Sequence, residues 1–424
     1  MQTFEWLRLD TAAKLFPSTT TKQESMVFRL VCELNETVDP IILQRALDVS
    51  LESFPFYRSV LRHGLFWYYL EKTNLTPEVH EEFSTPCAHL YNENRASLLF
   101  SLTYYRRRIN IEIYHVLADA VGASNFFRTI IYQYLMEKHK TELAENIRLS
   151  FDDAPIDQKI DNAFDTYYSK GKAAKQAKAV RAYRMRGERF SQSRFGIIEA
   201  HVSTEALLKK AHELNATLSE LLVSLLIFSF KDTLRQIDEK HPVDIKVPVD
   251  FRNFFSSTTK RNFLGVFDVS YNFGGQGKTF KDVLENVQRI FKSELTQEKM
   301  IEQINWYSSF EQAPLLKIIP LVIKNLALKN VSSTEKKRSS ATFSNLGAIK
   351  MPKEFSQYIR LFSIFCSVKD LYVGVCSFQD ITTISFTSPF IKMSIQRSFC
   401  RELSSFGIDV EIAANIQDLE PEGL

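Results

Sequence analysis

A chain of 424 residues is longer than a single hydrophobic core usually supports, so we expect two domains of roughly 200 residues each. Hydrophobic residues make up 45% and charged residues 24% of the chain, an ordinary composition for a soluble globular protein. The net charge of +3 is too small to indicate nucleic acid as a partner. Phenylalanine is unusually common, with 34 residues, which fits either large apolar cores or an apolar channel.

Cysteine usage and the apolar runs limit the compartment and the kinds of site. The five cysteines are never spaced Cys-x-x-Cys, so neither a disulfide framework nor a zinc site is indicated, and a reducing compartment is expected. Residues 1–14 carry charges where a signal peptide needs an apolar core. The apolar run 221–230 is too short to span a bilayer, and the run 314–328 is interrupted by lysines. We therefore expect a cytoplasmic protein without a transmembrane segment or a bound metal.

The first third of the chain predicts an α+β arrangement. An Asp39-Pro40 pair predicts the start of a helix whose apolar stripe runs to Leu51, and Pro55 ends it. Alternation and apolar runs predict strands at 26–34, 65–70, 98–105 and 109–115, and a helix at 123–137. Strands and helices in this order are typical of a mixed sheet with helices packed on it.

The composition changes between residues 150 and 193. The segment opens with five aspartates and then turns basic, with eight lysines and arginines between Lys170 and Arg189. We predict a crossover here, with an N-terminal domain at 1–150, a linker at 151–194 and a C-terminal domain at 195–424. The basic run is either a solvated linker or helix, or a surface that attracts the phosphates of a co-substrate or an acidic carrier protein.

The second half begins, like the first, with a strand followed by a helix. Strands are predicted at 195–202, 245–249, 341–347, 371–377 and 382–387, and helices at 204–214, 280–294 and 302–328. Thr217 and Glu220 have the spacing of a capping box ahead of an apolar helix at 221–230. The strand at 245–249 carries Asp250 and Arg252 to its end.

One strand leads directly into reactive side chains. Three isoleucines at 109, 111 and 113 alternate with polar or aromatic residues, and His115 falls on the isoleucine side, four residues before Asp119. With eight histidines, roughly 0.5 matches to His-x-x-x-Asp are expected by chance at average usage. The spacing alone therefore favours a core histidine tied to a carboxylate over a functional base at a strand exit.

Three stretches resemble a known family. YHVLADAVGAS at 114–124 resembles the H-x-x-x-D-G loop of the coenzyme A-dependent acyltransferase superfamily, which includes chloramphenicol acetyltransferase, condensation domains, polyketide-associated acyltransferases and alcohol acetyltransferases. VPVDFR at 247–252 and ATFSNLG at 341–347 resemble further segments of it, closest to the alcohol acetyltransferase-like and polyketide-associated branch. Tyr114 replaces the first histidine of condensation domains, and Ala120 replaces a glycine that would let the turn take a positive φ.

The resemblance implies a fold and a set of roles. It implies two similar chloramphenicol acetyltransferase-like lobes with an active-site tunnel between them. His115 would be the general base, and Asp119 would be held by an ion pair with Arg252 to support the loop. Ser344 and Asn345 are candidates for the oxyanion or the channel. The chain has no Gly-x-Ser-x-Gly motif, which favours direct transfer over a serine-bound intermediate.

The function implied is transfer of an acyl group from a thioester to a hydroxyl acceptor. The co-substrate would be acyl-CoA or an acyl carrier protein, with no tightly bound cofactor, and the acceptor a small-molecule alcohol or amine. Two alternatives stay open: an amide-forming condensation enzyme, and a catalytically silent module of the same fold that binds a carrier protein or an acyl chain. Nucleic-acid binding is not favoured, because the basic run has no aromatic residues interleaved on a strand platform.

Overall fold

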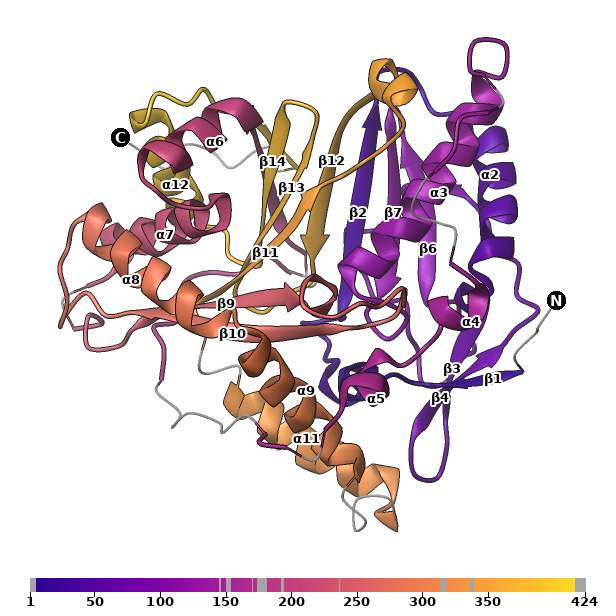
Figure 1. The fold of residues 1–424 in the computed structure, drawn as a ribbon, viewed down its shortest axis with the longest axis horizontal. Helices are drawn as coiled ribbons and strands as arrows, with labels where there is room; N and C mark the ends of the chain where they lie inside the picture. Colours follow the sequence, from indigo (N-terminus) through magenta and orange to yellow (C-terminus); the bar gives the residue numbers. More distant parts are fainter. Residues whose placement is uncertain are drawn as a thin grey trace.

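Two large β-sheets with helices packed against them form the body of the chain (Figure 1). This computed structural model describes residues 5–144, 146–149, 154–169, 171–173, 181–191, 194–235, 237–312, 318–335 and 339–415. One sheet has five strands and the other seven, and a separate hydrophobic core lies against each of them. The architecture has the predicted α+β class, with two lobes.

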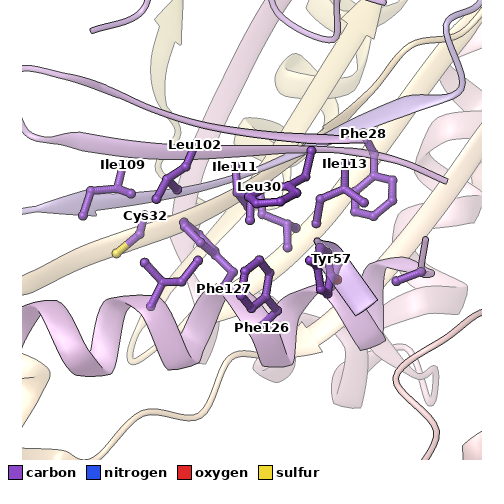
Figure 2. Close-up of a cluster of buried hydrophobic side chains, with 14 of the residues drawn as sticks. Phe28, Leu30, Cys32, Tyr57, Leu102, Ile109, Ile111, Ile113, Phe126 and Phe127 are labelled. Atoms are coloured by element: carbon purple, nitrogen blue, oxygen red, sulfur yellow. The ribbon is translucent and has the colours of Figure 1, made fainter. Parts of the chain in front are cut away.

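The first sheet has the order β12-β2-β7-β6-β5. Its strands are β2 (Val27–Leu34), β5 (His80–Glu81), β6 (Phe100–Tyr105), β7 (Arg108–Tyr114) and β12 (Ile359–Cys366). Helices α2 (Pro40–Ser53) and α3 (Ala120–Lys138) pack against each other beside it. Figure 2 shows the isoleucines of β7 facing Phe126 and Phe127 of α3. The side chain of Asp39 caps α2 by accepting hydrogen bonds from two backbone N–H groups, as its position before Pro40 predicts.

Strand β7 is buried on both faces, not on one. The polar side chains that alternate with the isoleucines, Asn110 and Glu112, are 2% and 4% exposed, and Tyr114 is fully buried. Glu112 forms an ion pair with Arg29 of β2 at 2.8 Å, and Tyr114 stacks on Tyr91. The alternation in the sequence therefore separates an apolar face from a polar face that is itself covered.

The second sheet has the order β10-β9-β11-β13-β14-β8-β15. Its strands are β8 (Gly196–Ser203), β9 (Val243–Asp250), β10 (Leu264–Tyr271), β11 (Ala341–Ala348), β13 (Leu371–Phe378), β14 (Ile381–Ser388) and β15 (Glu411–Ala414). The helices of this lobe are α6 (Thr204–Glu213), α7 (Leu218–Phe230), α8 (Phe280–Glu294) and α12 (Ser394–Ser405). Helix α7 is apolar on nearly all sides and packs against α8 and α12, and Thr217 and Glu220 form the predicted capping box at its start.

The two lobes are joined by a strand exchange. β12 belongs to the C-terminal half of the chain but pairs antiparallel with β2 in the first sheet, and it also packs against β13 and β14 of the second (Figure 1). Nη1 of Arg108 on β7 lies 2.7 Å from a carboxylate oxygen of the buried Glu199 on β8, so an ion pair crosses between the sheets. The predicted division into an N-terminal domain (1–150), a linker (151–194) and a C-terminal domain (195–424) stays a prediction. In the structure, β12 comes from the last of these ranges but completes the sheet of the first.

The remaining elements lie outside the two large sheets and the helices packed on them. They are β1 (Trp6–Arg8), β3 (Ser59–His63), β4 (Tyr68–Lys72), η1 (Ala13–Leu15), α1 (Phe16–Thr19), η2 (Pro55–Tyr57), α4 (Ile156–Lys159), α5 (Ala163–Tyr167), η4 (Lys231–Thr233), η5 (Phe251–Asn253), α9 (Gln297–Gln312), α11 (Leu321–Glu335) and η7 (Lys353–Gln357). The strand predicted at 65–70 begins only at Tyr68, because Leu65 and Phe66 lie in the turn before β4 and are exposed.

Among the described residues, no single helix is long and apolar enough to cross a membrane, although α6 and α7, bent by 85° at their junction, pass that test as a pair.

Candidate functional site

His115 follows the last residue of β7. Its backbone N–H donates to the carbonyl of Met26 at 2.9 Å, which extends the pairing with β2 and fixes where the side chain leaves the sheet. The imidazole is half-buried. It stacks on Phe16 with ring centres 4.4 Å apart and meets the edge of Phe28 at 5.2 Å. Two aromatic side chains therefore restrict the ring to one orientation.

The amide of Asn262 fixes the tautomer of His115. Asn262 Nδ2 donates to the backbone carbonyl of His115 at 3.0 Å and to a carboxylate oxygen of Asp10 at 3.1 Å. Both partners are acceptors, so the nitrogen of the amide must face them and the oxygen must face His115 Nδ1, 2.9 Å away. Nδ1 then carries the hydrogen, and in the neutral ring Nε2 carries the free lone pair. Within the described residues, Nε2 makes no hydrogen bond to protein.

Asp10 anchors this amide from the N-terminal segment. The carboxylate is fully buried and also accepts from the backbone N–H of Ala13 at 2.7 Å. Burial raises the pKa of Asp10 above its usual value, while the guanidinium of Arg261, at 3.5 Å, acts in the opposite direction. Arg261 is itself 2% exposed and donates to the carbonyl of Arg8 at 2.8 Å. Asp10, Arg261 and Asn262 thus form one buried polar unit beside the histidine.

Asp119 does not face the imidazole. It is the N-cap of α3 and accepts from the backbone N–H of Gly122 at 2.8 Å. Its other oxygen accepts from Arg252 Nη1 at 2.9 Å and from the backbone N–H of Phe263 at 2.8 Å. The expected ion pair is therefore present, and it connects the loop after β7 to the segment that carries Asn262.

Arg252 holds that segment with further hydrogen bonds. Its Nε donates to the carbonyl of Thr259 at 3.1 Å and its Nη2 to the carbonyl of Arg261 at 2.6 Å, while Nη1 also lies 2.8 Å from Asp250. Attraction to Asp119 and Asp250 raises the pKa of Arg252 against the opposing effect of burial, so the guanidinium stays charged. One side chain thereby positions both the Asp119 loop and the backbone next to Asn262.

Ala120 does not distort the loop, contrary to what its replacement of a glycine suggests. It is the first residue of α3, which starts three residues earlier than the predicted helix at 123–137, and its φ is not positive. Alanine is the best helix former, so it suits this position. The glycine that the loop needs is Gly122, because a Cβ there would overlap the backbone carbonyl of Lys260.

Burial sets the protonation state of His115. Desolvation lowers the pKa of His115 below its usual value of about 6.5, and the nearby Asp119 carboxylate and the Asn262 hydrogen bond oppose this shift. The ring is therefore neutral at pH 7. A neutral imidazole with an unshared pair on Nε2 can accept a proton from an attacking hydroxyl or amine.

Ser344 and Asn345 lie on β11, away from this hydrogen-bond network. Asn345 Nδ2 donates to Ser219 at the start of α7 at 3.0 Å, and its oxygen accepts from the backbone N–H of Gly347 at 2.9 Å. Among the described residues, neither side chain hydrogen-bonds to His115. An oxyanion or channel role for them stays a prediction.

The expected tunnel also stays a prediction. The largest cavity described, about 990 Å³, is bounded by the N-terminal segment around Leu9 and Lys14, by Trp67 on the turn before β4 and by Glu311 of α9. It flanks the segment that packs on His115, but the histidine itself lines neither this cavity nor three smaller ones bounded by described residues. The same part of the chain holds no group of three or more histidines, cysteines or acids suited to a metal ion.

Solved structures share this fold across nearly the whole chain. The chain has the two-lobed fold of the coenzyme A-dependent acyltransferases and condensation domains. Polyketide synthase associated protein 5 from Mycobacterium tuberculosis superposes with a TM-score of 0.61 at 14% identity, over 93% of this chain and 96% of that one. F. sporotrichioides TRI101, complexed with coenzyme A and T-2, superposes with a TM-score of 0.63 at 11% sequence identity. The superposition covers 96% of this chain and 100% of that one.

A condensation domain is equally similar. The first condensation domain of the calcium-dependent antibiotic synthetase, in complex with a substrate analogue, gives a TM-score of 0.63 at 12% identity, over 95% of this chain and 96% of that one. No family model and no curated protein matches the sequence. The comparisons therefore establish the fold, and the chemistry has to be argued from the residues.

Sequence reasoning did not find the residues that orient the histidine. Arg261 and Asn262 lie nine and ten residues after Arg252, but nothing in their spacing marks them. Asp10 and Phe16 come from an N-terminal segment with no recognisable motif. All four act through contacts between residues more than 90 positions apart, and one sequence gives no signal for such contacts.

Proposed function

We propose that this protein is an acyltransferase that moves an acyl group from a thioester, either acyl-CoA or an acyl carrier protein, to a hydroxyl acceptor. His115 is the general base, and its Nε2 removes the acceptor's proton as the oxygen attacks the thioester carbonyl. The thiol leaves with a proton, and no covalent enzyme intermediate is required. Coenzyme A is a co-substrate in this scheme and not a resident cofactor, and a cytoplasmic location is part of the proposal.

The observation that carries the proposal is the orientation of His115. The Asn262 hydrogen bond leaves the lone pair on the ring nitrogen that has no protein partner among the described residues, which is the arrangement a base requires. Asp119 is occupied by Arg252 and supports the loop, so the site is not a Ser-His-Asp triad. Ser344 and Asn345, both half-buried on β11, are the proposed hydrogen-bond donors for the oxyanion or the channel wall.

One observation favours the alternative, a catalytically silent module that binds a carrier protein or an acyl chain. Phe16 lies flat against the imidazole at 4.4 Å, so one face of the ring is covered in this structure. An active enzyme has to admit the acceptor at Nε2 along the ring edge or displace α1. The silent module requires neither.

Thiol release separates the two functions. The purified protein is incubated with acetyl-CoA and a panel of alcohols and amines, and free thiol is measured for wild type, His115→Ala and the exposed-histidine control His80→Ala. We expect release with alcohols in wild type and in His80→Ala, and a loss of about 10²- to 10⁴-fold in kcat/KM in His115→Ala, as for removal of a general base. No acceptor-dependent release by wild type would support the silent module, and a preference for amines would support a condensation enzyme.

A further inference from the structure

A cavity of about 460 Å³ at the far end of the second sheet has a strongly basic wall. It is bounded by residues 181–186, which lie within the predicted linker 151–194, and by residues after η4. Its side chains include five cations and one carboxylate, Asp238, whereas the whole chain carries 53 basic and 50 acidic residues. The five cations are Arg181, Arg184, Arg186, Arg235 and Lys240. Positive charge is thus concentrated here and is not a property of the chain as a whole.

The acidic groups nearby neutralise only part of this charge. Asp238 pairs with Arg235 at 2.8 Å and more loosely with Arg186 at 3.9 Å, and Asp370 pairs with Arg184 at 3.3 Å. Arg181 and Lys240 are exposed and form no ion pair with any described residue. The Nε atom of Arg184 is buried and has no hydrogen-bond partner in the described part of the chain. Gathering cations without counter-charges costs electrostatic free energy, which a bound anion would offset.

The backbone that carries these arginines is fixed by the second sheet. The N–H of Tyr183 donates to the carbonyl of Pro242 at 2.8 Å, and Ser340 Oγ donates to the carbonyl of Tyr183 at 2.5 Å. Further along, the N–H of Ile391 donates to the carbonyl of Glu188 at 3.0 Å. The segment is therefore held against the starts of β9 and β11 and the end of β14, and the arginines are presented from a fixed position.

We propose that this cavity binds a phosphate group of an anionic ligand. Arginine suits phosphate because its planar guanidinium can donate two parallel hydrogen bonds, and several arginines around one cavity match the several oxygens of a phosphate. The cavity is distinct from the His115 site. It adjoins Val243 at the start of β9, and Asp250 at the other end of that strand contacts Arg252, which places about 23 Å of strand between the two sites.

Binding can be tested without turnover, so the proposal does not depend on acyl transfer. Inorganic pyrophosphate is titrated into the full chain by calorimetry, using wild type, the cavity variant R181Q/R186Q/K240Q and the control variant K140Q/K209Q/K353Q. The control removes the same charge from exposed lysines outside the cavity. We expect the Kd of wild type to rise with salt, the Kd of the cavity variant to be about tenfold higher than that of wild type, and the control to match wild type. No binding by wild type, or equal weakening in both variants, would overturn the proposal.

Competition identifies where the phosphate comes from. Coenzyme A and dephospho-coenzyme A, which lacks the 3′-phosphate, are each used to displace pyrophosphate from wild type. Stronger displacement by coenzyme A assigns the site to the 3′-phosphate of a thioester donor. Equal displacement by the two, with free phosphate compounds still competing, assigns it to a separate phosphate ligand.

Discussion

The tautomer of His115 depends on the orientation of one amide group. Asn262 is 1% exposed, and its nitrogen donates to two acceptors, so reversing the amide would leave the Asp10 carboxylate and the His115 carbonyl facing an oxygen. Such a reversal would bury unsatisfied acceptors at a cost of about 1–3 kcal/mol each. Asn262 is therefore a positioning residue that acts through the histidine and does not itself need to touch substrate.

Replacing Asn262 with leucine should change the pH dependence of the reaction. The Asn262 hydrogen bond supports the protonated imidazole, so its loss should lower the pKa of His115 further. We expect the acidic limb of kcat/KM to move to lower pH in Asn262→Leu, and kcat to fall about 10²-fold because the tautomer is no longer fixed. Steady-state rates measured across pH check both effects.

A matched control distinguishes positioning from structural damage. Asn305 is also nearly fully buried and hydrogen-bonded. Its partners are Ser169 and Lys172, which take no part in the hydrogen bonds described around His115. Asn305→Leu should lower stability without moving the acidic limb. An identical pH profile for Asn262→Leu and wild type would show that the amide does not tune the histidine.

Substitutions at Ala120 and Gly122 should affect different properties, stability in the first case and activity in the second. Ala120→Gly places glycine at the first turn of α3, so stability should fall by up to about 1 kcal/mol while activity is retained. Gly122→Ala brings a methyl group onto the carbonyl of Lys260 and should displace the segment that carries Asn262, with loss of activity. Urea denaturation and thiol-release rates measure the two effects. Higher activity in Ala120→Gly would contradict the helical role of Ala120.

At the scale of elements, the sequence predicted most of the scaffold and only part of the site. The bounds of α8, the capping box of α7 and the Asp39 cap of α2 were predictable because they depend on residues within a few positions of each other. The start of α3 was predicted too late. Asp119 was interpreted only as an ion-pair partner, whereas it also caps the helix. The ion pair between Asp119 and Arg252 was anticipated through the family resemblance, and no periodicity in the sequence points to it.

The Asp119–Arg252 pair should contribute more to stability than an exposed pair of the same charge. Its side chains are 5% and 13% exposed, so removing one partner leaves a buried charge or an unsatisfied donor. We expect Asp119→Asn and Arg252→Gln each to lower the free energy of unfolding by about 3–5 kcal/mol, and the double variant to lose less than the sum. The comparison is the Lys278–Glu239 pair, in which Lys278 is 53% exposed, where single changes should cost at most about 1 kcal/mol. Additive losses at Asp119 and Arg252, measured by urea denaturation, would show that the pair is not coupled.

At the scale of the whole molecule, a network of charged side chains centred on the buried Glu33 and Glu199 links the lobes. Glu199 of β8 accepts from Arg108 of β7 and from Ser363 of β12, and Arg360 of β12 pairs with Glu33 of β2 and Glu411 of β15. These contacts join strands of both sheets where β12 crosses between them. The lobes should therefore unfold in one transition, even though each has its own core.

His201 makes this junction sensitive to acid. It lies on β8, is 5% exposed, and neither ring nitrogen has a hydrogen-bond partner among the described residues. The charged groups that affect it are Glu199 on its own strand, Arg108, Arg360 and Glu411. Burial is the largest effect and lowers the pKa of His201 below its usual value.

The lowered pKa of His201 determines the sign of the pH dependence. The unfolded chain takes up a proton on this histidine near pH 6.5 while the folded chain does not, so stability should fall as the pH drops below that value. The slope is about 1.4 kcal/mol per pH unit for each such histidine, and His115, whose pKa is also lowered, adds to it. His201→Leu should therefore reduce the change in the free energy of unfolding per pH unit by the contribution of one histidine. The reduction should appear between pH 6.5 and the lower pKa that His201 has in the folded chain. Urea denaturation at several pH values measures this slope, and an unchanged slope in His201→Leu would show that His201 is not held neutral at the lobe junction.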